Sequence, residues 1–506
     1  MSTLRALARA QALAAGRAQP VATVRHLHLA ERPLVVVPLT MAGEANAPLA
    51  ALVGAAPDEA RLLTVAQPRN RDQRLRFVSE LAEIVLPYLD EYRGATEAVP
   101  VDRGRDVRHR YVDAPQVVVP NPAGVTFLRL LGRAIRFRRV DGDHPVPPSV
   151  PLLGQWLTFF AERAEHPGSA TTVALTEALS LHWATGQSVM EDLHLPALLG
   201  WIDPPPGQDG PTAAALAEDP DRCPPAGPTT DPEFDNRVLA PAMAAYDAAV
   251  DDPRARAAAY AHLTGLLRGQ LAPTWDLVWR GLSLLRTLPA GARVAARFTG
   301  DRDSFTGYCE HVDAGGGPQP SRDGAVAAAA RLHRLERALT SYAVQRAYDD
   351  PLVMAEYRLT GEAFVGEVTL ADPHRIDDTG KRPVLRPRIQ VVTEESVAVP
   401  VGAVLYSPTR PGQKARAVYL TRTDSGTEVV LELSGGMGRG RTAAPGTVPE
   451  VGERLCYTTL TDTFLPAAAF PAPEETPWTH GGPPVTSAAP TAGVPVEGPG
   501  RVGATR

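Results

Sequence analysis

The clearest hydrophobic pattern in the chain is a series of six short runs rich in residues that favour β-strands. The runs are EAFVGEVTL, RPRIQVVT, GAVLYSP, KARAVYLTRT, TEVVLELS and ERLCYTT, and all lie within 359–465. Turn-forming residues separate them, including Pro411-Gly412 and the glycine-rich segment 435–440. Short strands at this spacing, with turns between them, predict a small β-barrel or sandwich over 351–465.

A different pattern marks the N-terminal part of the chain. LVVVPL (34–39), LLTVA (62–66) and VVV (117–119) are continuous apolar runs, which are typical of strands buried on both faces. Apolar residues recur at helical spacing over 72–88 and 125–135. Strands that alternate with helices predict a parallel or mixed α/β region over 1–146.

Helical periodicity dominates the middle of the chain, over 147–350. The helical segments are Leu152–Arg163, Thr171–Thr185, Leu239–Val250, Ala255–Gln270, Thr274–Leu288 and Ala325–Tyr348. A proline-rich linker at 203–232 interrupts them, and we expect no regular structure there. Trp275 and Trp279 share one helical face, which is either a stacking platform or, as we expect, a buried helix surface.

The predicted fold class is therefore α+β and multidomain, with an N-terminal α/β region, a helical middle and a C-terminal small β-barrel. The segment 466–506 is rich in Pro, Gly, Ala and Thr, and we expect a disordered tail there.

The amino-acid composition indicates the kind of organism and the cellular compartment. Of 51 basic residues only Lys381 and Lys414 are lysine, which indicates a GC-rich bacterial genome more than selection for phosphate binding. The net charge of −6 argues against a protein that binds nucleic acid over its whole surface. Three widely spaced cysteines are typical of a reducing cytoplasm. No apolar run approaches the ~20 residues that a membrane span requires.

Motifs for common catalytic chemistry are missing. Neither lysine ends a phosphate-binding glycine loop, and no HExxH, G-x-S-x-G or strand-linked G-x-G-x-x-G motif occurs. The segment GDRDSFTGYCEH places Asp301, Asp303, Glu310 and His311 close together, as a divalent-metal site would. We prefer to interpret it as a helix N-terminus capped by Asp303, and we predict neither a cofactor nor a metal.

Positive charge gathers in the C-terminal part. The segment 381–441 contains ten basic and five acidic side chains, in a chain that is negative overall. Within it, GGMGRGR (435–441) could bring two arginines and flexible backbone to phosphates, or be a hairpin loop with solvated arginines. The candidate nucleic-acid-binding residues are Arg410, Lys414, Arg416, Arg439 and Arg441.

The pieces GEVTL, RPRIQVVTEESVAVPVGAVLYSPTRPGQKARAVYL and TEVVLELSGGMGRG give Glu362–Thr459 a resemblance to a known module. The segment resembles the accessory β-barrel near the motor of some superfamily-one helicases. In that family the barrel contacts single-stranded nucleic acid or couples it to the motor. Because motor motifs are missing here, the resemblance implies a module that works beside a separate ATPase or helicase.

Three hypotheses follow for the function. The leading one is a non-catalytic adaptor whose barrel binds single-stranded nucleic acid or a separate ATPase. The second is an enzyme, metal-dependent and directed at nucleic acid, whose site lies on loops after the N-terminal strands. Its candidate residues are Thr40, Glu44, Arg69, Asn70, Arg71, Asp72 and Asn121. The third is a protein-binding scaffold that recruits partners through the linker and the tail.

Overall fold

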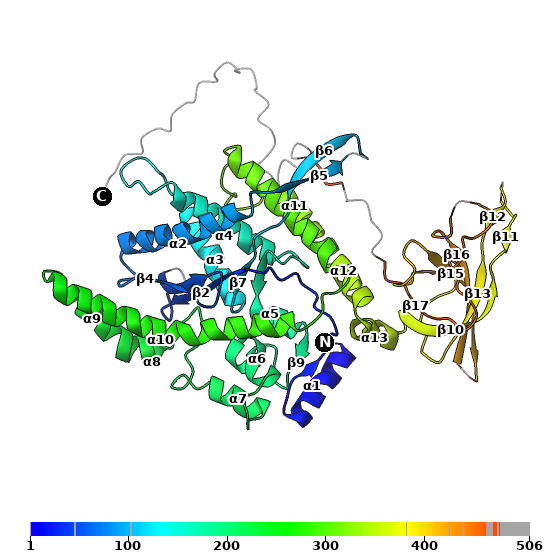
Figure 1. The fold of residues 1–506 in the computed structure, drawn as a ribbon, viewed down its shortest axis with the longest axis horizontal. Coiled ribbons are helices and arrows are strands. Elements are labelled where there is room, and N and C mark those ends of the chain that lie inside the picture. The colour runs from blue at the N-terminus through cyan, green and yellow to red at the C-terminus, as the bar shows by residue number, and fades with distance from the viewer. Residues whose placement is uncertain are drawn as a thin grey trace, which may run out of the picture. The chain divides into compact units, whose positions relative to one another are not determined.

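A five-stranded mixed sheet forms the centre of the N-terminal region (Figure 1). The strands are β2 (Leu34–Thr40), β3 (Pro48–Gly54), β4 (Arg61–Thr64), β7 (Val117–Val119) and β8 (Thr172–Ala174), in the order β4-β3-β2-β7-β8. β3 runs antiparallel to β2 and β4, whereas β7 is parallel to β2 and β8. All residues of β2, β3, β7 and β8 are buried, which explains why their sequences do not alternate.

Helices cover both faces of this sheet (Figure 1). One face packs on α2 (Arg71–Glu91), α3 (Pro122–Ile135), α4 (Ser149–Ala164) and α11 (Val294–Asp313). The other packs on α5 (Leu175–Ser180), α6 (Leu195–Ile202) and α10 (Pro253–Arg286). Each face has its own apolar core, so the region is a three-layer α/β/α sandwich.

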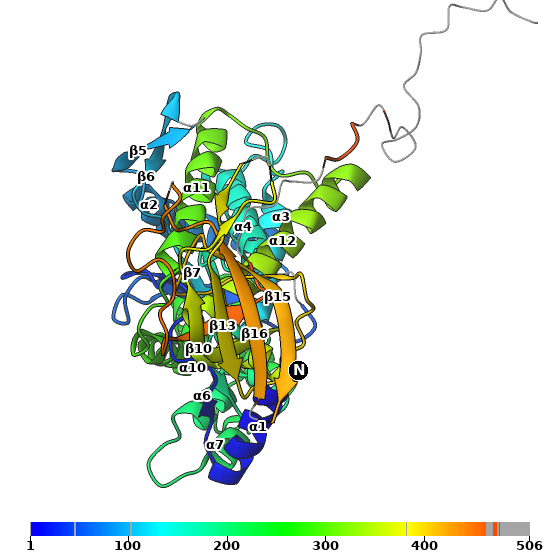
Figure 2. The same ribbon diagram turned by 90° about the vertical axis from the view of Figure 1, so that its right-hand side faces the viewer.

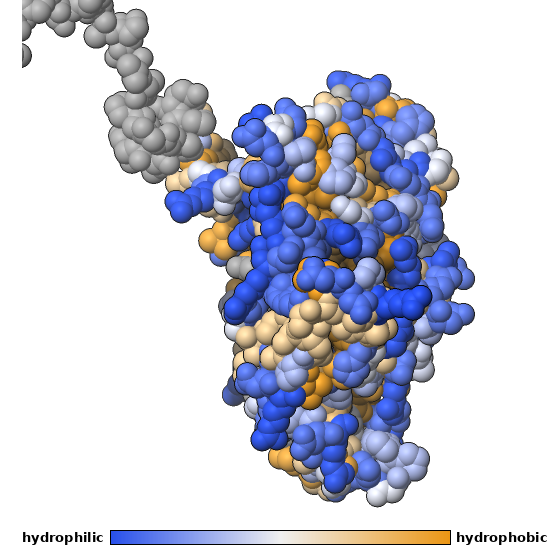
Figure 3. Space-filling view, turned by 90° about the vertical axis from the view of Figure 1, so that its left-hand side faces the viewer, coloured by the Kyte–Doolittle hydropathy of each residue, from blue (hydrophilic) through white to orange (hydrophobic). Residues whose placement is uncertain are grey.

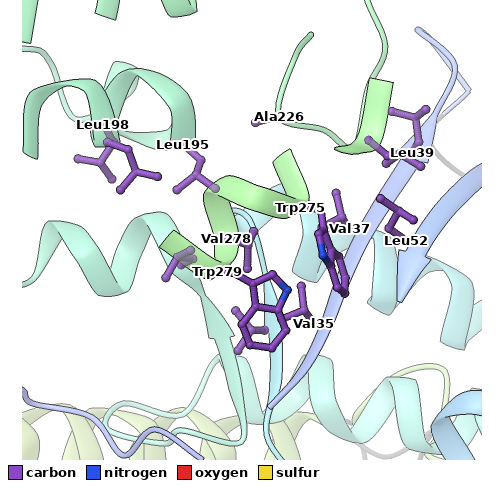
Figure 4. Close-up of a cluster of buried hydrophobic side chains, with 14 of the residues drawn as sticks. Val35, Val37, Leu39, Leu52, Leu195, Leu198, Ala226, Trp275, Val278 and Trp279 are labelled. Atoms are coloured by element: carbon purple, nitrogen blue, oxygen red, sulfur yellow. The ribbon is translucent and has the colours of Figure 1, made fainter. Parts of the chain in front are cut away.

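Trp275 and Trp279 belong to the core of the α10 side. Figure 4 shows both indoles among Val35, Val37 and Leu52 of the sheet. The Trp275 indole N–H donates to the backbone carbonyl of Pro57 at 2.9 Å. The two tryptophans therefore fill a core, as expected, and offer no stacking platform to a ligand.

The remaining elements of this part are short or peripheral. They are α1 (Thr3–Ala15), β1 (Gln19–Pro20), β5 (Thr96–Val101), β6 (Asp106–Tyr111), β9 (Trp183–Ala184), η2 (Glu191–Leu193), α7 (Gly210–Ala217), α8 (Pro232–Phe234), η3 (Asp235–Leu239), α9 (Ala240–Ala248), α12 (Ala325–Asp349) and α13 (Pro351–Thr360). β5 and β6 form a hairpin, and β1 pairs with β9.

The C-terminal region is a nearly closed antiparallel barrel of six strands, and Figure 2 shows its neighbouring strands side by side. The strands are β10 (Ala363–Asp372), β13 (Arg388–Thr393), β14 (Val404–Leu405), β15 (Lys414–Thr423), β16 (Gly426–Ser434) and β17 (Arg454–Thr458), in the order β14-β15-β16-β13-β10-β17. A bridge between Tyr406 and Thr458 joins the two edge strands. Side chains such as Phe364, Leu431 and Tyr457 fill the interior. A two-stranded ribbon, β11 (Ile376–Asp377) with β12 (Val384–Leu385), is inserted between β10 and β13.

The predicted fold class is confirmed, and each of the six β-rich runs contains a barrel strand. Some local predictions were wrong. Thr171–Thr185 is not one helix, because it begins with β8 and ends with β9. The segments predicted over 255–270 and 274–288 are one helix, α10, which continues through Pro273. The linker at 203–232 contains the helix α7, where we expected no regular structure.

The structure is a computed structural model that describes residues 2–44, 47–101, 104–380, 382–424, 426–438, 440–461, 469–472 and 475. The chain divides into one unit of 1–319 with 337–463, and a second of 320–336 with 464–506. Most of the predicted disordered tail, 466–506, lies outside the described residues. Across the described helices none combines the length and apolarity of a bilayer-spanning segment. The face in Figure 3 is largely hydrophilic, with smaller apolar areas between the polar groups.

Candidate nucleic-acid interface on the barrel

Strand β15 presents two cations on the outer surface of the barrel. Lys414 and Arg416 are exposed, whereas Ala415 and Ala417 between them are buried in the barrel interior. This is the period-2 alternation of a half-buried strand, with small residues on the inner face and charged ones outside. In the described part of the chain neither cation has an ion pair.

A β-bulge brings an aromatic ring to the same outer surface. The register between β15 and β16 shifts between Ala417 and Tyr419, so that Tyr419 lies opposite Val430. Simple alternation would place Tyr419 on the inner face with Ala417, but the extra residue at the bulge reverses its side. Tyr419 is 56% exposed as a result, and Leu420 packs against the barrel core instead.

The strands beside Arg416 extend the positive surface. Arg416 lies opposite Glu432 of β16, which in turn lies opposite Arg388 of β13. Glu432 accepts hydrogen bonds from Arg375 at 2.8 Å and from Arg388 at 3.0 Å. Three arginines therefore surround one carboxylate, and the group keeps a net positive charge. Asp372, opposite Arg388, bounds it on the far side.

Arg410 forms hydrogen bonds within the barrel. Its guanidinium donates to both carboxylate oxygens of Glu453, at 2.6 and 2.8 Å, and only 16% of its side chain is exposed. In a second pair, Arg358 donates to Glu395, which also accepts the backbone N–H of Val365. Burial opposes ionisation of Glu395, but the hydrogen bonds from Arg358 and Val365 outweigh it and lower the pKa of this carboxyl. The module's own carboxylates thus neutralise part of its basic surplus.

The glycine-rich loop contributes one exposed arginine. Arg441 is exposed, and Arg439 lies outside the described residues. Gly435 and Gly436 have positive φ, at 72° and 65°, which favours glycine at both positions. Met437 is buried in the barrel core, so the loop is anchored at its middle.

The alternative site after the N-terminal strands is filled by the chain itself. The parallel strands β2 and β7 end at Thr40 and next to Asn121. The backbone of Thr40 pairs with the linker near Thr230, and the Asn121 amide donates to the Gly227 carbonyl at 2.9 Å. The linker segment 226–230 therefore lies where α/β sheets usually bind ligands.

The other residues of that alternative have local structural roles. Asn70 caps α2 by accepting the backbone N–H groups of Asp72 and Gln73. Arg69 pairs with Glu44 at 3.1 Å on the surface. Arg71 is the first residue of α2. Asn70, Arg69 and Glu44 therefore have partners within the chain.

In the acidic segment of α11, Asp301 and Asp303 form hydrogen bonds and ion pairs with other residues of the chain. Asp301 is buried and accepts hydrogen bonds from Arg163, Ser169 and the backbone of Ala170. Asp303 pairs with Arg110 at 3.2 Å, in the middle of the helix and not at its N-terminus as we had expected. Across the part of the chain that the structure describes, no group of three potential metal ligands is assembled.

Of the predicted binding residues, the structure brings Lys414 and Arg416 together on β15, beside a residue that the sequence analysis missed. Tyr419 lies in the same predicted strand as Lys414 and Arg416, but the side on which its ring lies depends on the β-bulge, which the sequence does not reveal. Comparisons with protein families, with characterised proteins and with solved structures find no match to the chain.

Proposed function

We propose that the barrel binds single-stranded nucleic acid along the outer face of β15, and that the protein acts as a non-catalytic adaptor. The observation that carries this proposal is the exposed ring of Tyr419 on the same strand as Lys414 and Arg416. Proteins that bind single strands combine cations that track the phosphates with aromatic rings on which bases stack.

The geometry favours an unpaired strand over a duplex. A ring that lies on the outer surface of a sheet can stack on a base only when the flat face of that base is free. Duplex bases are already stacked on their neighbours. The cations would contact the phosphates of either form, so Tyr419 is the group that discriminates between them.

The partner is a separate ATPase or helicase in this proposal. Support comes from the resemblance of Glu362–Thr459 to the accessory barrel of superfamily-one helicases, together with the missing motor motifs. The composition and the sparse cysteines support a bacterial, cytoplasmic setting. The hydrogen bonds of the linker segment 226–230 to Thr40 and Asn121 give these two strand-end residues partners within the chain, which favours the adaptor over the enzyme hypothesis.

Fluorescence anisotropy tests the proposal with labelled oligothymidine, oligouridine and a duplex, each of about 16 nucleotides or base pairs. We expect the single strands to bind more tightly than the duplex, with affinity that falls between about 50 and 200 mM salt. Equal affinity for the duplex, or no binding at the lower salt concentration, would contradict the proposal. A pull-down that recovers an ATPase without nucleic acid would favour the protein-partner form of the hypothesis instead.

A further inference from the structure

A small cavity lies between α2 and α3, two helices that pack on the same face of the N-terminal sheet (Figure 1). Its volume is about 70 Å³, which is room for about five water molecules. Pockets that enclose a whole small molecule commonly have volumes of about 300 Å³ or more. The cavity therefore suits a compact charged group, either alone or as the head of a larger ligand.

Three arginines supply all the charge of the cavity wall. Arg71 and Arg74 are three residues apart on α2 and so share one face of that helix. Arg138 comes from the other side, in the turn that follows α3. The residues that line the cavity include no acid, so the wall carries a formal charge of +3.

The guanidinium groups of these arginines have no partners within the described part of the chain. None of the three forms an ion pair or a side-chain hydrogen bond there. Neighbouring arginines differ in this respect, since Arg69 pairs with Glu44 at 3.1 Å and Arg139 pairs with Asp141 at 3.1 Å. Three like charges around one cavity repel one another, and a bound anion would replace this repulsion by attraction.

Buried apolar side chains form the rest of the wall. Val78 of α2 and Leu131 and Ile135 of α3 line the cavity, and all three belong to the core beneath it. An apolar boundary lowers the effective dielectric constant, so charges that meet there interact more strongly than they would in open water. The cavity thus differs from a set of arginines spread over a solvated surface.

We propose that this cavity binds a phosphate group, with its oxygens against the guanidinium groups of Arg71, Arg74 and Arg138. The planar fork of a guanidinium matches two oxygens of a phosphate, and a dianion compensates more of the +3 charge than a carboxylate does. The same group occurs in inorganic phosphate and in phosphate monoesters, whose remaining atoms would lie outside the cavity.

Isothermal titration of the full-length protein tests this site with inorganic phosphate, methyl phosphate and acetate, at constant ionic strength. At about pH 8 both phosphates carry close to two negative charges, whereas acetate carries one. We expect both phosphates to bind, and acetate to bind about tenfold or more weakly, because it offers fewer charge-assisted hydrogen bonds. Tighter binding of inorganic phosphate assigns the site to the free anion, and equal or tighter binding of methyl phosphate assigns it to a monoester.

Matched variants locate the binding in the cavity. Arg74→Gln should weaken phosphate binding about tenfold or more, whereas Arg139→Gln, which removes a paired arginine beside the cavity, should leave it unchanged. Ala134→Glu adds a carboxylate at an exposed position of the wall and should also weaken binding, more than the neutral Ala134→Gln does. The proposal is overturned if acetate binds as tightly as phosphate, if neither phosphate binds, or if Arg74→Gln and Ala134→Glu both bind phosphate like the wild type.

The barrel surface provides an independent control. A double variant with Lys414→Gln and Arg416→Gln should bind phosphate like the wild type, because these cations do not line the cavity. The proposed function of the barrel therefore stands or falls separately from the phosphate site.

Discussion

The guanidinium of Arg410 donates to both carboxylate oxygens of Glu453, across a sequence separation of 43 residues. The same guanidinium donates to the carbonyls of Gly446 and Thr447, so one side chain fixes the turn before β15 to the segment before β17. In a nearly closed barrel, these contacts hold together parts of the chain that are not hydrogen-bonded as neighbouring strands. Arg410 is therefore a structural residue of the barrel.

Removal of Arg410 should destabilise the barrel more than it weakens binding. Arg410→Ala removes the ion-pair partner of Glu453, and we expect a loss of ~2 kcal/mol in the free energy of unfolding. Urea unfolding followed by circular dichroism measures this loss. The control is Arg416→Ala, which removes an exposed cation and should leave stability unchanged. If Arg410→Ala kept the stability of the wild type but lost nucleic-acid binding, Arg410 would be a binding residue and not a structural one.

Tyr419 should carry the stacking part of the binding energy. We expect Tyr419→Ala to lose ~1–3 kcal/mol of affinity for a single strand, because the platform for one base is removed. Tyr419→Phe keeps the ring and should bind like the wild type. Tyr260→Ala, at another exposed tyrosine on α10, is the matched control in the same anisotropy assay. An alanine variant with full affinity would exclude stacking on Tyr419.

Lys414 and Arg416 should each contribute to the salt dependence of nucleic-acid binding. Each contact with a phosphate releases counterions, so the loss of one cation should lower the slope of log K against log salt by about 0.7 for a single strand. We expect Lys414→Gln and Arg416→Gln each to produce this change, and the double variant about twice as much. Arg268→Gln on α10, where the residue is exposed, provides the control. Unchanged slopes in both single variants would place the phosphates elsewhere.

A buried histidine predicts a specific acid sensitivity of the N-terminal region. Nε2 of His182 accepts the backbone N–H of His26 at 3.1 Å, and its Nδ1 lies 2.7 Å from the Ala178 carbonyl. Burial lowers the pKa of His182 to about 4, from an ordinary value of 6.5. Between these values the unfolded chain binds the proton and the folded chain does not, so stability falls as the pH decreases from 6.5 to about 4. The loss amounts to about 3 kcal/mol.

Urea unfolding at about pH 7 and about pH 4.5 checks this prediction. His182→Gln keeps an acceptor for the His26 N–H but cannot be protonated, so it should lose less stability on acidification than the wild type. Asp350, which lies beside His26, affects the stability of the folded chain at a lower pH than His182 does. Burial opposes ionisation of Asp350, but the His26 ring, whose Nε2 lies 3.3 Å from Oδ2, and hydrogen bonds from Thr23 lower its pKa to about 2. The contribution of Asp350 to stability is therefore lost as the pH falls below its ordinary value of 3.8. An equal loss of stability in both proteins between pH 7 and 4.5 would contradict the assignment to His182.

The sequence predicted the barrel because its short β-rich runs are separated by turn-forming residues. KARAVYLTRT was predicted as one of these strands, and in the structure Lys414 and Arg416 point outward and the alanines inward. The sequence could not place Tyr419, since a bulge changes the side of every later residue and leaves no mark in the local pattern. Nor could it assign Arg410, whose partner Glu453 is brought near only by closure of the barrel.

In the N-terminal region, the elements that were predicted wrongly also depend on contacts or context that the local sequence does not contain. β3 has the sequence PLAALVG, and its alanine-rich composition does not distinguish a buried strand from a buried helix. β8 has three residues and continues directly into α5, so helical periodicity extended over it. The linker contains prolines that predict irregular structure, but its hydrogen bonds to Thr40 and Asn121 depend on the assembled sheet.

Photo-crosslinking tests the central claim about β15 most directly. An oligonucleotide that carries 5-iodouracil is bound to the full-length protein and irradiated, and tryptic peptides are analysed by mass spectrometry. Trypsin cleaves after Arg416 and Arg422, so a base stacked on Tyr419 is found on the peptide 417–422. We predict that this peptide carries the main crosslink and that Tyr419→Phe retains it. A main crosslink on any peptide outside β15, with binding intact, would contradict the account.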